Sequence, residues 1–284
     1  MISGFLKIDK EADYTSSDVD RVIKRQLDVP KVGHLGTLDP FATGLLIISV
    51  NEACKLTPMI PDGDKEYVAT LCLGKTTPSL DTETEICDIK DVGRYTEDEI
   101  KSVLSSMLGR QLQTPPLYSA KHYKGTKAYF LAREGSKITL PPHEIQIHSL
   151  ELVHYDSKEN TIVFKTCVSK GTYIRTLGSD IAKKLGTIGY LTALRRTRIG
   201  HFSLDGAIRC KDAKKEDLLP LTYFNPEIKK IECDETLSFR VKNGQTLKLE
   251  EREDYLFMME KERLLALYKR EGRVYHCYKG IRND

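Results

Sequence analysis

The 284-residue chain has no long hydrophobic run and no segment with the composition of a leader. Its longest largely apolar stretch, residues 45–50, is far too short to cross a bilayer. The first seven residues lack the basic and then apolar pattern of a secretory signal. These absences predict a cytoplasmic protein without a membrane partner.

Closely spaced cysteine pairs are also missing. The seven cysteines are scattered along the chain, and no two of them form a Cys-x-x-Cys pair. This odd, unpaired set is typical of free thiols in a reducing cytoplasm. The spacing excludes a zinc site built on these cysteines, so we predict no metal site.

The small net charge of +3 hides an uneven distribution of charge. Residues 165–215 contain twelve Lys and Arg but three acids, whereas residues 75–100 contain eight acids and three bases. A local concentration of cations favours an anionic partner such as a nucleic acid. Solvated helix faces also produce charge runs, so charge alone leaves both interpretations open.

Apolar periodicity and capping residues predict strands and helices without a regular βαβ repeat, which indicates an α+β fold with a mixed sheet. We expect strands at residues 5–9, 65–73, 145–155, 161–168 and 190–204, a strand after the Asp39 loop, and helices after Thr15 and Thr96 and at residues 53–59, 128–134 and 173–185. Pro220 and Pro226 bracket a polar stretch, so we predict two domains, residues 1–224 and 225–284. The second domain should be a small β-barrel with strands within residues 237–249 and 256–278.

One segment places a single acid in a turn bounded by glycines: Gly33-His34-Leu35-Gly36-Thr37-Leu38-Asp39-Pro40-Phe41-Ala42-Thr43-Gly44. The proline after Asp39 biases this residue away from helix, and the glycines allow tight bends. A carboxylate placed in this way is rigid and can project into a cleft. The same residues also fit an Asx-type turn in which Asp39 is only structural.

This segment resembles the catalytic loop of the TruB family of tRNA pseudouridine synthases, whose aspartate is the indispensable residue. Leu35 stands where the family usually has Thr. Further segments similar to the family follow in the same order and cover nearly the whole chain: residues 4–18, 115–120, 125–135, 169–177 and 191–197. Glu11 and Pro78 replace a proline and an acid of the family pattern, and Lys121 stands one position before the family's lysine.

The resemblance implies a catalytic domain of the pseudouridine synthase fold followed by a small PUA-like domain, and it implies conversion of uridine to pseudouridine. That reaction breaks the bond between ribose C1′ and base N1 and rejoins the base through C5, so it needs neither a metal nor another cofactor. It needs a carboxylate beside the ribose, as nucleophile or base, and a cation that keeps the carboxylate ionised. The resemblance assigns these roles to Asp39 and Arg175.

The resemblance also implies a pocket for the target base. Tyr67 would stack on the uracil and handle a proton at C5, while Tyr173 and Leu194 would line the pocket. Taken one at a time and without the resemblance, these three residues and Arg175 also fit ordinary structural roles.

The target base must leave its stack before an enzyme can reach C1′. By resemblance, His34 would help to fill the disrupted RNA loop, although an isolated histidine in such a turn also fits a plain loop residue. We further expect Lys10, Lys170, Arg195, Arg196 and Arg198 to contact RNA. The C-terminal segment, around residues 239–245, would add RNA-binding surface.

These observations predict a monomeric enzyme that acts on uridine 55 in the TΨC stem-loop of tRNA without an obligatory protein partner. The first motif begins a few residues into the chain, which favours a stand-alone enzyme over a guided, dyskerin-like synthase. An RNA-binding chaperone with a structural Asp39 is the second alternative. A phosphate-transferring enzyme is excluded, because the loop lacks Gly-Lys-Ser/Thr and Asp39 lacks an Asp-x-Asp partner.

Overall fold

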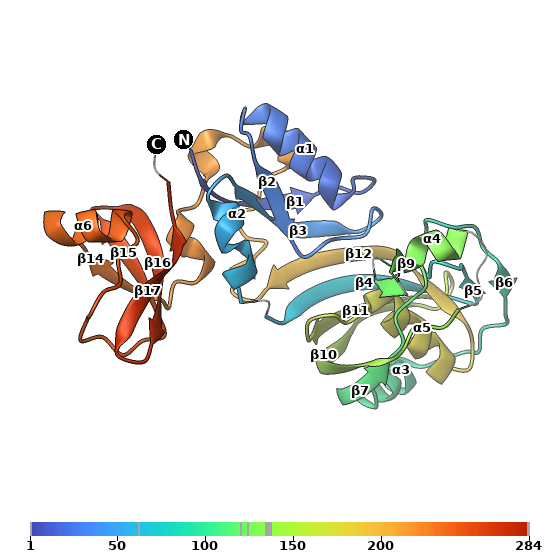
Figure 1. Ribbon diagram of the computed structural model, residues 1–284. Helices are drawn as coiled ribbons and strands as arrows, with labels where there is room; N and C mark the ends of the chain where they lie inside the picture. The colour runs from blue at the N-terminus through green and yellow to red at the C-terminus, as the bar shows by residue number, and fades with distance from the viewer. Residues whose placement is uncertain (1, 62, 120, 124, 134–137, 283–284) are drawn as a thin grey trace.

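A nine-stranded mixed sheet forms the larger part of the protein. The computed structural model describes residues 2–61, 63–119, 121–123, 125–133 and 138–282 (Figure 1). The main strands follow the order β1-β3-β12-β4-β11-β10-β7, with β2 paired to β3 and β13 paired to β12. Their bounds are β1 Gly4–Lys10, β2 Val32–Leu35, β3 Thr43–Val50, β4 Lys65–Leu73, β7 Gly109–Gln113, β10 His143–Asp156, β11 Thr161–Val168, β12 Gly189–Ile199 and β13 Phe202–Ser203. Only the β3–β12 pair is parallel among the pairings of this sheet in the described residues, which confirms the mixed α+β prediction.

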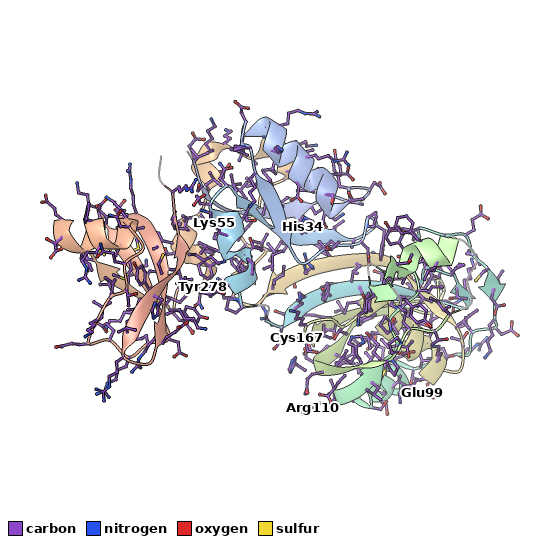
Figure 2. The ribbon with its side chains drawn as sticks, in the orientation of Figure 1. His34, Lys55, Glu99, Arg110, Cys167 and Tyr278 are labelled. Carbon is purple, nitrogen blue, oxygen red and sulfur yellow. The ribbon has the colours of Figure 1, made fainter. Side chains whose placement is uncertain are left out.

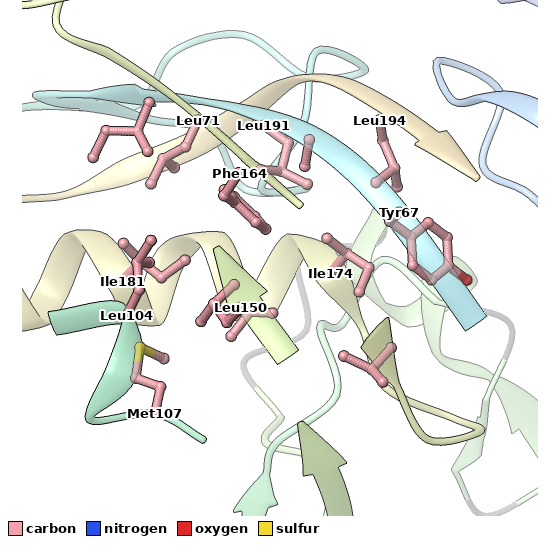
Figure 3. Close-up of a cluster of buried hydrophobic side chains, with 14 of the residues drawn as sticks. Tyr67, Leu71, Leu104, Met107, Leu150, Phe164, Ile174, Ile181, Leu191 and Leu194 are labelled. Carbon is pink, nitrogen blue, oxygen red and sulfur yellow. The ribbon is translucent and has the colours of Figure 1, made fainter. Parts of the chain in front are cut away.

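The central strand β4 shows why the sheet has two different faces. Burial alternates along its whole length, with Tyr67, Ala69 and Leu71 inside and their neighbours partly exposed. Helices α3 (Glu97–Ser105) and α5 (Ile174–Lys184) pack on the buried face. Figure 3 shows side chains of both helices meeting those of β4 and β12. An antiparallel sheet can leave its other face to water in this way.

Helix α1 (Ser16–Gln26) covers the β1–β3 part of the sheet (Figure 1). Thr15 caps it in a capping box with Asp18, and Val19 and Ile23 pack on Leu6. The predicted helix after Thr96 is confirmed by an equivalent capping box with Glu99. In both cases the cap is a local interaction, which is why sequence alone located the start of each helix.

The remaining elements are short. They are α2 Ala53–Leu56, η1 Thr57–Met59, β5 Lys75–Thr76, β6 Asp88–Ile89, β8 His122–Tyr123, β9 Thr126–Lys127, α4 Ala128–Arg133, η2 Cys210–Asp212, η3 Lys215–Asp217 and η4 Leu221–Phe224. The predicted end of the helix at residues 128–134 lies outside the described residues. Within the described ranges, no helix has both the length and the apolar composition needed to cross a membrane.

A separate four-stranded sheet, consistent with a PUA-like domain, follows the larger sheet along the chain. It has the order β14-β15-β16-β17, from β14 Lys229–Glu232, β15 Tyr255–Glu260, β16 Arg263–Glu271 and β17 Val274–Gly280. The strand expected at the start of residues 237–249 is wrong, because Glu235–Lys242 form helix α6. The Asp234 carboxylate accepts the Leu237 N–H at 2.7 Å and caps this helix, a signal the sequence analysis did not use.

The C-terminal sheet shares a hydrophobic core with the larger sheet. The ring of Phe224 lies between those of Phe5 and Phe257, at centroid distances of 6.2 and 5.5 Å. Leu56 of α2 and Leu267 of β16 belong to the same buried cluster. In Figure 2 Lys55 of α2 lies beside this sheet, and its ammonium donates to the Gly280 carbonyl at 3.2 Å. The boundary at residues 224 and 225 stays a prediction.

Candidate active site

The backbone of the loop that carries Asp39 is held from both ends. The buried hydroxyl of Ser16 accepts the Leu38 N–H at 2.9 Å and donates to the Leu38 carbonyl at 3.3 Å. The ammonium of Lys10 donates to the Pro40 carbonyl at 3.1 Å. Because its neighbours are fixed in this way, the Asp39 side chain starts from a defined position.

Arg196 of β12 fastens the beginning of the same loop. Its buried guanidinium donates to the carbonyls of Leu45 at 2.8 Å and Gly36 at 2.7 Å. Nη1 of the same group lies 3.4 Å from the Thr37 carbonyl oxygen. Gly44 lets the backbones of β3 and β12 come close at Arg196: a β-carbon there would lie 2.3 Å from the Arg196 carbonyl oxygen. Arg196 thus positions the loop and also lines the cavity described below, and its expected contact with RNA stays a prediction.

Lys10 is held in a similar way, and its expected contact with RNA also stays a prediction. It is fully buried, and its ammonium also donates to the carbonyls of Glu11 at 3.0 Å and Tyr14 at 2.6 Å. Burial lowers the pKa of Lys10 to about 8, against the attraction of the nearby Asp39 carboxylate. All three donors of the ammonium therefore have carbonyl partners in this structure. Glu11, the departure from the family pattern, contributes only its backbone here.

Asp39 and Arg175 form a bidentate ion pair. Arg175 Nε lies 2.9 Å from Asp39 Oδ2, and Nη2 donates to Oδ1 at 3.2 Å. The Arg175 side chain is 5% exposed and that of Asp39 is 34% exposed. The guanidinium thus stays in the interior, while the carboxylate it holds faces an opening. The pairing expected from the resemblance is present in the structure.

A second carboxylate, which the sequence analysis did not assign, completes the surroundings of Arg175. Asp81 Oδ2 lies 3.3 Å from Arg175 Nη1, and the Asp81 side chain is 1% exposed. The guanidinium also donates to the carbonyls of Ser79 at 2.8 Å and Tyr118 at 2.9 Å. Burial raises the pKa of Asp81, and the Ser79 hydroxyl and the charge of Arg175 oppose that shift.

The turn before Asp81 shows why the site tolerates a proline at position 78, where the family pattern has an acid. Pro78 is exposed, whereas Thr77 and Ser79 on either side of it are buried. Leu80 has a φ of +62°, a left-handed conformation that is unfavourable for a bulky side chain. This strained turn directs the next residue, Asp81, to Arg175. The acid missing at position 78 therefore leaves the interior of the site intact.

A cavity of about 240 Å³ opens above the ion pair. It brings together the five residues predicted for catalysis and base binding: Asp39, Tyr67, Tyr173, Arg175 and Leu194. Figure 3 shows the Tyr67 ring on β4 close to Leu194 and Ile174. The cavity is large enough for a small planar group and has an aromatic ring, an apolar side chain and a carboxylate in its wall.

The family model of the TruB family pseudouridylate synthase N-terminal domain matches residues 24–174, which include the Asp39 loop and Tyr67. This chain belongs to the TruB family. It is 39% identical over 246 residues to tRNA pseudouridine synthase B of Acholeplasma laidlawii, a match that covers 87% of each chain. It is 42% identical over 219 residues to tRNA pseudouridine synthase B of Desulfotalea psychrophila, which covers 76% of this chain and 89% of that protein.

Solved structures support the fold of this TruB family member. The crystal structure of a Cbf5-Nop10-Gar1 complex matches with a TM-score of 0.67 and 24% identity over 94% of this chain and 78% of that chain. The structure of an H/ACA RNP bound to a substrate RNA containing 2′-deoxyuridine matches with a TM-score of 0.69 and 22% identity over 99% of this chain and 86% of that chain. At these identities the likeness concerns the fold alone.

The cavity of this pseudouridine synthase also contains polar residues to which sequence reasoning gave no role: Thr37, Lys65, Ser119, Lys121 and Thr172. Ser119 is buried, and its hydroxyl lies beside the Tyr173 phenol. The family resemblance could have located Ser119, because it lies in the segment 115–120. Lys121 faces the cavity from one position before the lysine of the TruB pattern.

Tyr173 is positioned by a side chain far away in sequence. The buried amide of Gln113 accepts the Tyr173 N–H at 2.8 Å and donates to its carbonyl at 3.0 Å. Tyr173 is the residue before α5, so Gln113 also fixes the start of the helix that carries Arg175. Burial raises the pKa of Tyr173, and a hydrogen bond with Ser119 and the charge of Arg175 oppose that shift.

Apart from Arg196, which lines the cavity, the residues expected to bind RNA lie outside its wall. Arg195 pairs with Asp9 at 2.7 Å, and Arg198 pairs with Glu66. Both lie across from the outward-facing positions of β4, on the side of the sheet away from Tyr67. Lys170 is exposed and precedes Gly171, a cavity residue. Among the described residues no cluster of three His, Cys, Asp or Glu side chains could hold a metal ion.

Proposed function

We propose that this TruB family enzyme converts uridine 55 in the TΨC loop of tRNA to pseudouridine, with Asp39 as the essential catalytic residue. The observation that carries the proposal is the bidentate pair between Asp39 and the buried Arg175 at a cavity that also contains Tyr67. The curated relatives named tRNA pseudouridine synthase B support tRNA as the substrate.

The chemistry fits this arrangement of side chains. Arg175 donates two hydrogen bonds to the carboxylate and fixes its orientation at the cavity. In one route Asp39 attacks C1′, the uracil leaves as an anion, and the ester bond to Asp39 breaks when C5 attacks C1′. In the other, Asp39 removes a ribose proton as the uracil leaves and returns it to the ribose when C5 bonds to C1′. In both, the base turns, C5 bonds to C1′, and the C5 proton is lost while N1 regains one. Atoms and electrons balance without a cofactor.

The wall of the cavity would control the released base. Tyr67 offers a ring face for stacking and a hydroxyl for the proton at C5. Leu194 and Tyr173 would limit the space in which the uracil turns, so that C5 meets C1′ before the base escapes. Extrusion of the nucleotide from the RNA loop must come first, since a stacked base cannot reach Asp39.

The test is an unmodified tRNA transcript treated with the enzyme alone, without guide RNA. Pseudouridine is mapped by carbodiimide-stop primer extension for the wild type, Asp39→Asn, and Asp13→Asn as a control at an exposed aspartate. We expect a stop at position 55 with the wild type and Asp13→Asn only, and tRNA binding by all three proteins.

Each other result overturns a defined part of the proposal. A stop at a different uridine would contradict the assigned site. A stop with Asp39→Asn would remove Asp39 from the chemistry. Binding without any stop favours a chaperone, and a stop that appears only when a guide RNA and partner proteins are added favours the guided synthase.

A further inference from the structure

His34 of β2 is held by a carboxylate from helix α1. His34 Nδ1 lies 2.7 Å from Asp20 Oδ2, and both side chains are about one fifth exposed. Figure 2 shows His34 at the sheet below α1, away from the exterior side of that helix. Asp20 was not singled out by the motif analysis, because nothing in its local sequence distinguishes it from any acid on a solvated helix.

The pairing defines which ring nitrogen carries a proton. An ionised carboxylate only accepts hydrogen bonds, so Nδ1 must donate to Asp20. In the neutral ring Nε2 is then the acceptor, and it lies 3.4 Å from the Thr37 hydroxyl. Thr37 is exposed, lines the cavity and precedes Asp39 by two residues. The ring thus has one nitrogen anchored on α1 and the other directed at the catalytic loop.

The second oxygen of Asp20 gives an independent observation. Asp20 Oδ1 is buried and has no hydrogen-bond partner in the described ranges. A buried acceptor left without a donor costs about 1–3 kcal/mol. An acid that served only to solubilise α1 would turn both oxygens to water. The carboxylate instead keeps one oxygen on the imidazole while the other is removed from solvent.

We propose that Asp20 is a positioning residue that fixes the tautomer and the orientation of His34, so that Nε2 faces the catalytic loop and the RNA loop that binds over it. The part concerning RNA rests on the proposed function, in which His34 contacts the disrupted TΨC loop. Histidines whose second nitrogen has a functional task are commonly oriented by a carboxylate in this manner.

The first measurement requires no RNA. Ring ¹⁵N chemical shifts of His34 are recorded for the wild type, Asp20→Leu and Asp20→Asn, each checked for folding by its backbone spectrum. Leu has a similar size and a higher helix propensity, which protects α1. We expect the Nδ1–H form in the wild type, and in Asp20→Leu a shift towards the Nε2–H form. An unchanged tautomer in both variants would overturn the inference.

The second measurement asks whether Asp20 acts through His34. With a tRNA transcript, Asp20→Leu should lower kcat/KM about tenfold, mainly through KM, which corresponds to about 1.4 kcal/mol. In a His34→Ala background the same change should have no further effect, because the group it positions is gone. Ser17→Ala, at an exposed position of α1, is the control and should leave kcat/KM unchanged.

The two measurements test separately whether Asp20 sets the tautomer of His34 and whether His34 contacts RNA. If His34→Ala itself retains full kcat/KM, the role of His34 in RNA contact is wrong, while the NMR result still decides whether Asp20 sets the tautomer. If Asp20→Leu lowers kcat/KM equally in both backgrounds, Asp20 acts on α1 as a structural residue and the positioning role is refuted.

Discussion

The cavity around Asp39 and the C-terminal sheet differ in where their charged side chains lie. Around the cavity the interior contains full charges: Lys10, Asp81, Arg175 and Arg196 are all buried. In the C-terminal sheet the described ion pairs, such as Lys229 with Glu251 and Lys242 with Glu260, lie at the surface, and the interior is apolar.

This difference shows that the cavity holds its side chains in a defined geometry at a cost to stability. A buried charge loses its hydration, and the loss is recovered only while every partner is in place. Exposed pairs contribute little to folding, because water and salt screen them. The cavity therefore depends on single side chains, whereas the C-terminal sheet depends on the area of its apolar core. The following predictions test this contrast, from the largest expected effect to the smallest.

Arg175→Met should be the most harmful change. It leaves Asp39 and Asp81 without their shared cation, so the free energy of unfolding should fall by about 3–5 kcal/mol. Loss of the Asp39 orientation should lower kcat by about 10²-fold or more. Urea unfolding and single-turnover assays measure the two effects. Arg21→Met, at an arginine that is 74% exposed, is the control; equal effects of both changes would contradict the central role of Arg175.

Phe257→Ala should remove stability without altering the chemistry. Its ring is fully buried in the core shared by the two sheets, so truncation should cost about 3–5 kcal/mol. At a temperature where the variant is folded, kcat should match the wild type. Phe239→Ala, at a ring that is 66% exposed, should change stability by less than about 0.5 kcal/mol. A large loss of kcat in folded Phe257→Ala would show that the two regions are catalytically coupled.

Asp81→Asn should reduce catalysis more than stability. Asn keeps the size of the side chain and can still meet Ser79, but it no longer attracts the guanidinium of Arg175. We expect kcat to fall by about 10- to 100-fold while tRNA binding is retained, because the Asp39–Arg175 pair loses one of its supports. Asp88→Asn, at an exposed acid of the same segment, should have no effect. Full activity of Asp81→Asn would make this carboxylate a packing residue.

Lys10 should add a pH dependence to folding that is smaller than these effects. Burial lowers the pKa of Lys10 from 10.5 to about 8. Between these values the unfolded chain binds a proton that the folded chain has released, so the free energy of unfolding rises with pH in this window. The difference between wild type and Lys10→Met in urea unfolding should therefore increase from pH 8 towards pH 10.5. Lys24→Met, at an exposed lysine, is the control; a flat difference for Lys10→Met would contradict the assignment.

The sequence predicted the elements that depend on local interactions. Strand β4 follows from strict alternation, and α1 and α3 follow from capping boxes. Helix α6 was mistaken for a strand because its apolar residues also alternate over a short stretch and its Asp234 cap was not considered.

The candidate site was only partly predictable. Asp39, Arg175 and Tyr67 could be named because they lie in motifs, whereas the place of Asp81 follows from a left-handed turn at Leu80. The burial of Lys10 could not be inferred either. A long charged side chain is normally exposed, and only the tertiary fold shows the carbonyls that surround it.

The aromatic contact among Phe5, Phe224 and Phe257 has a mechanical consequence. Because the two sheets share one core, the C-terminal sheet cannot swing on a linker, as lightly joined domains do. The span from its surface to Asp39 is therefore a fixed length. An RNA that touches both the C-terminal sheet and the cavity must fit its own shape to that distance. An RNA with a longer or shorter arm would not place its target base at Asp39.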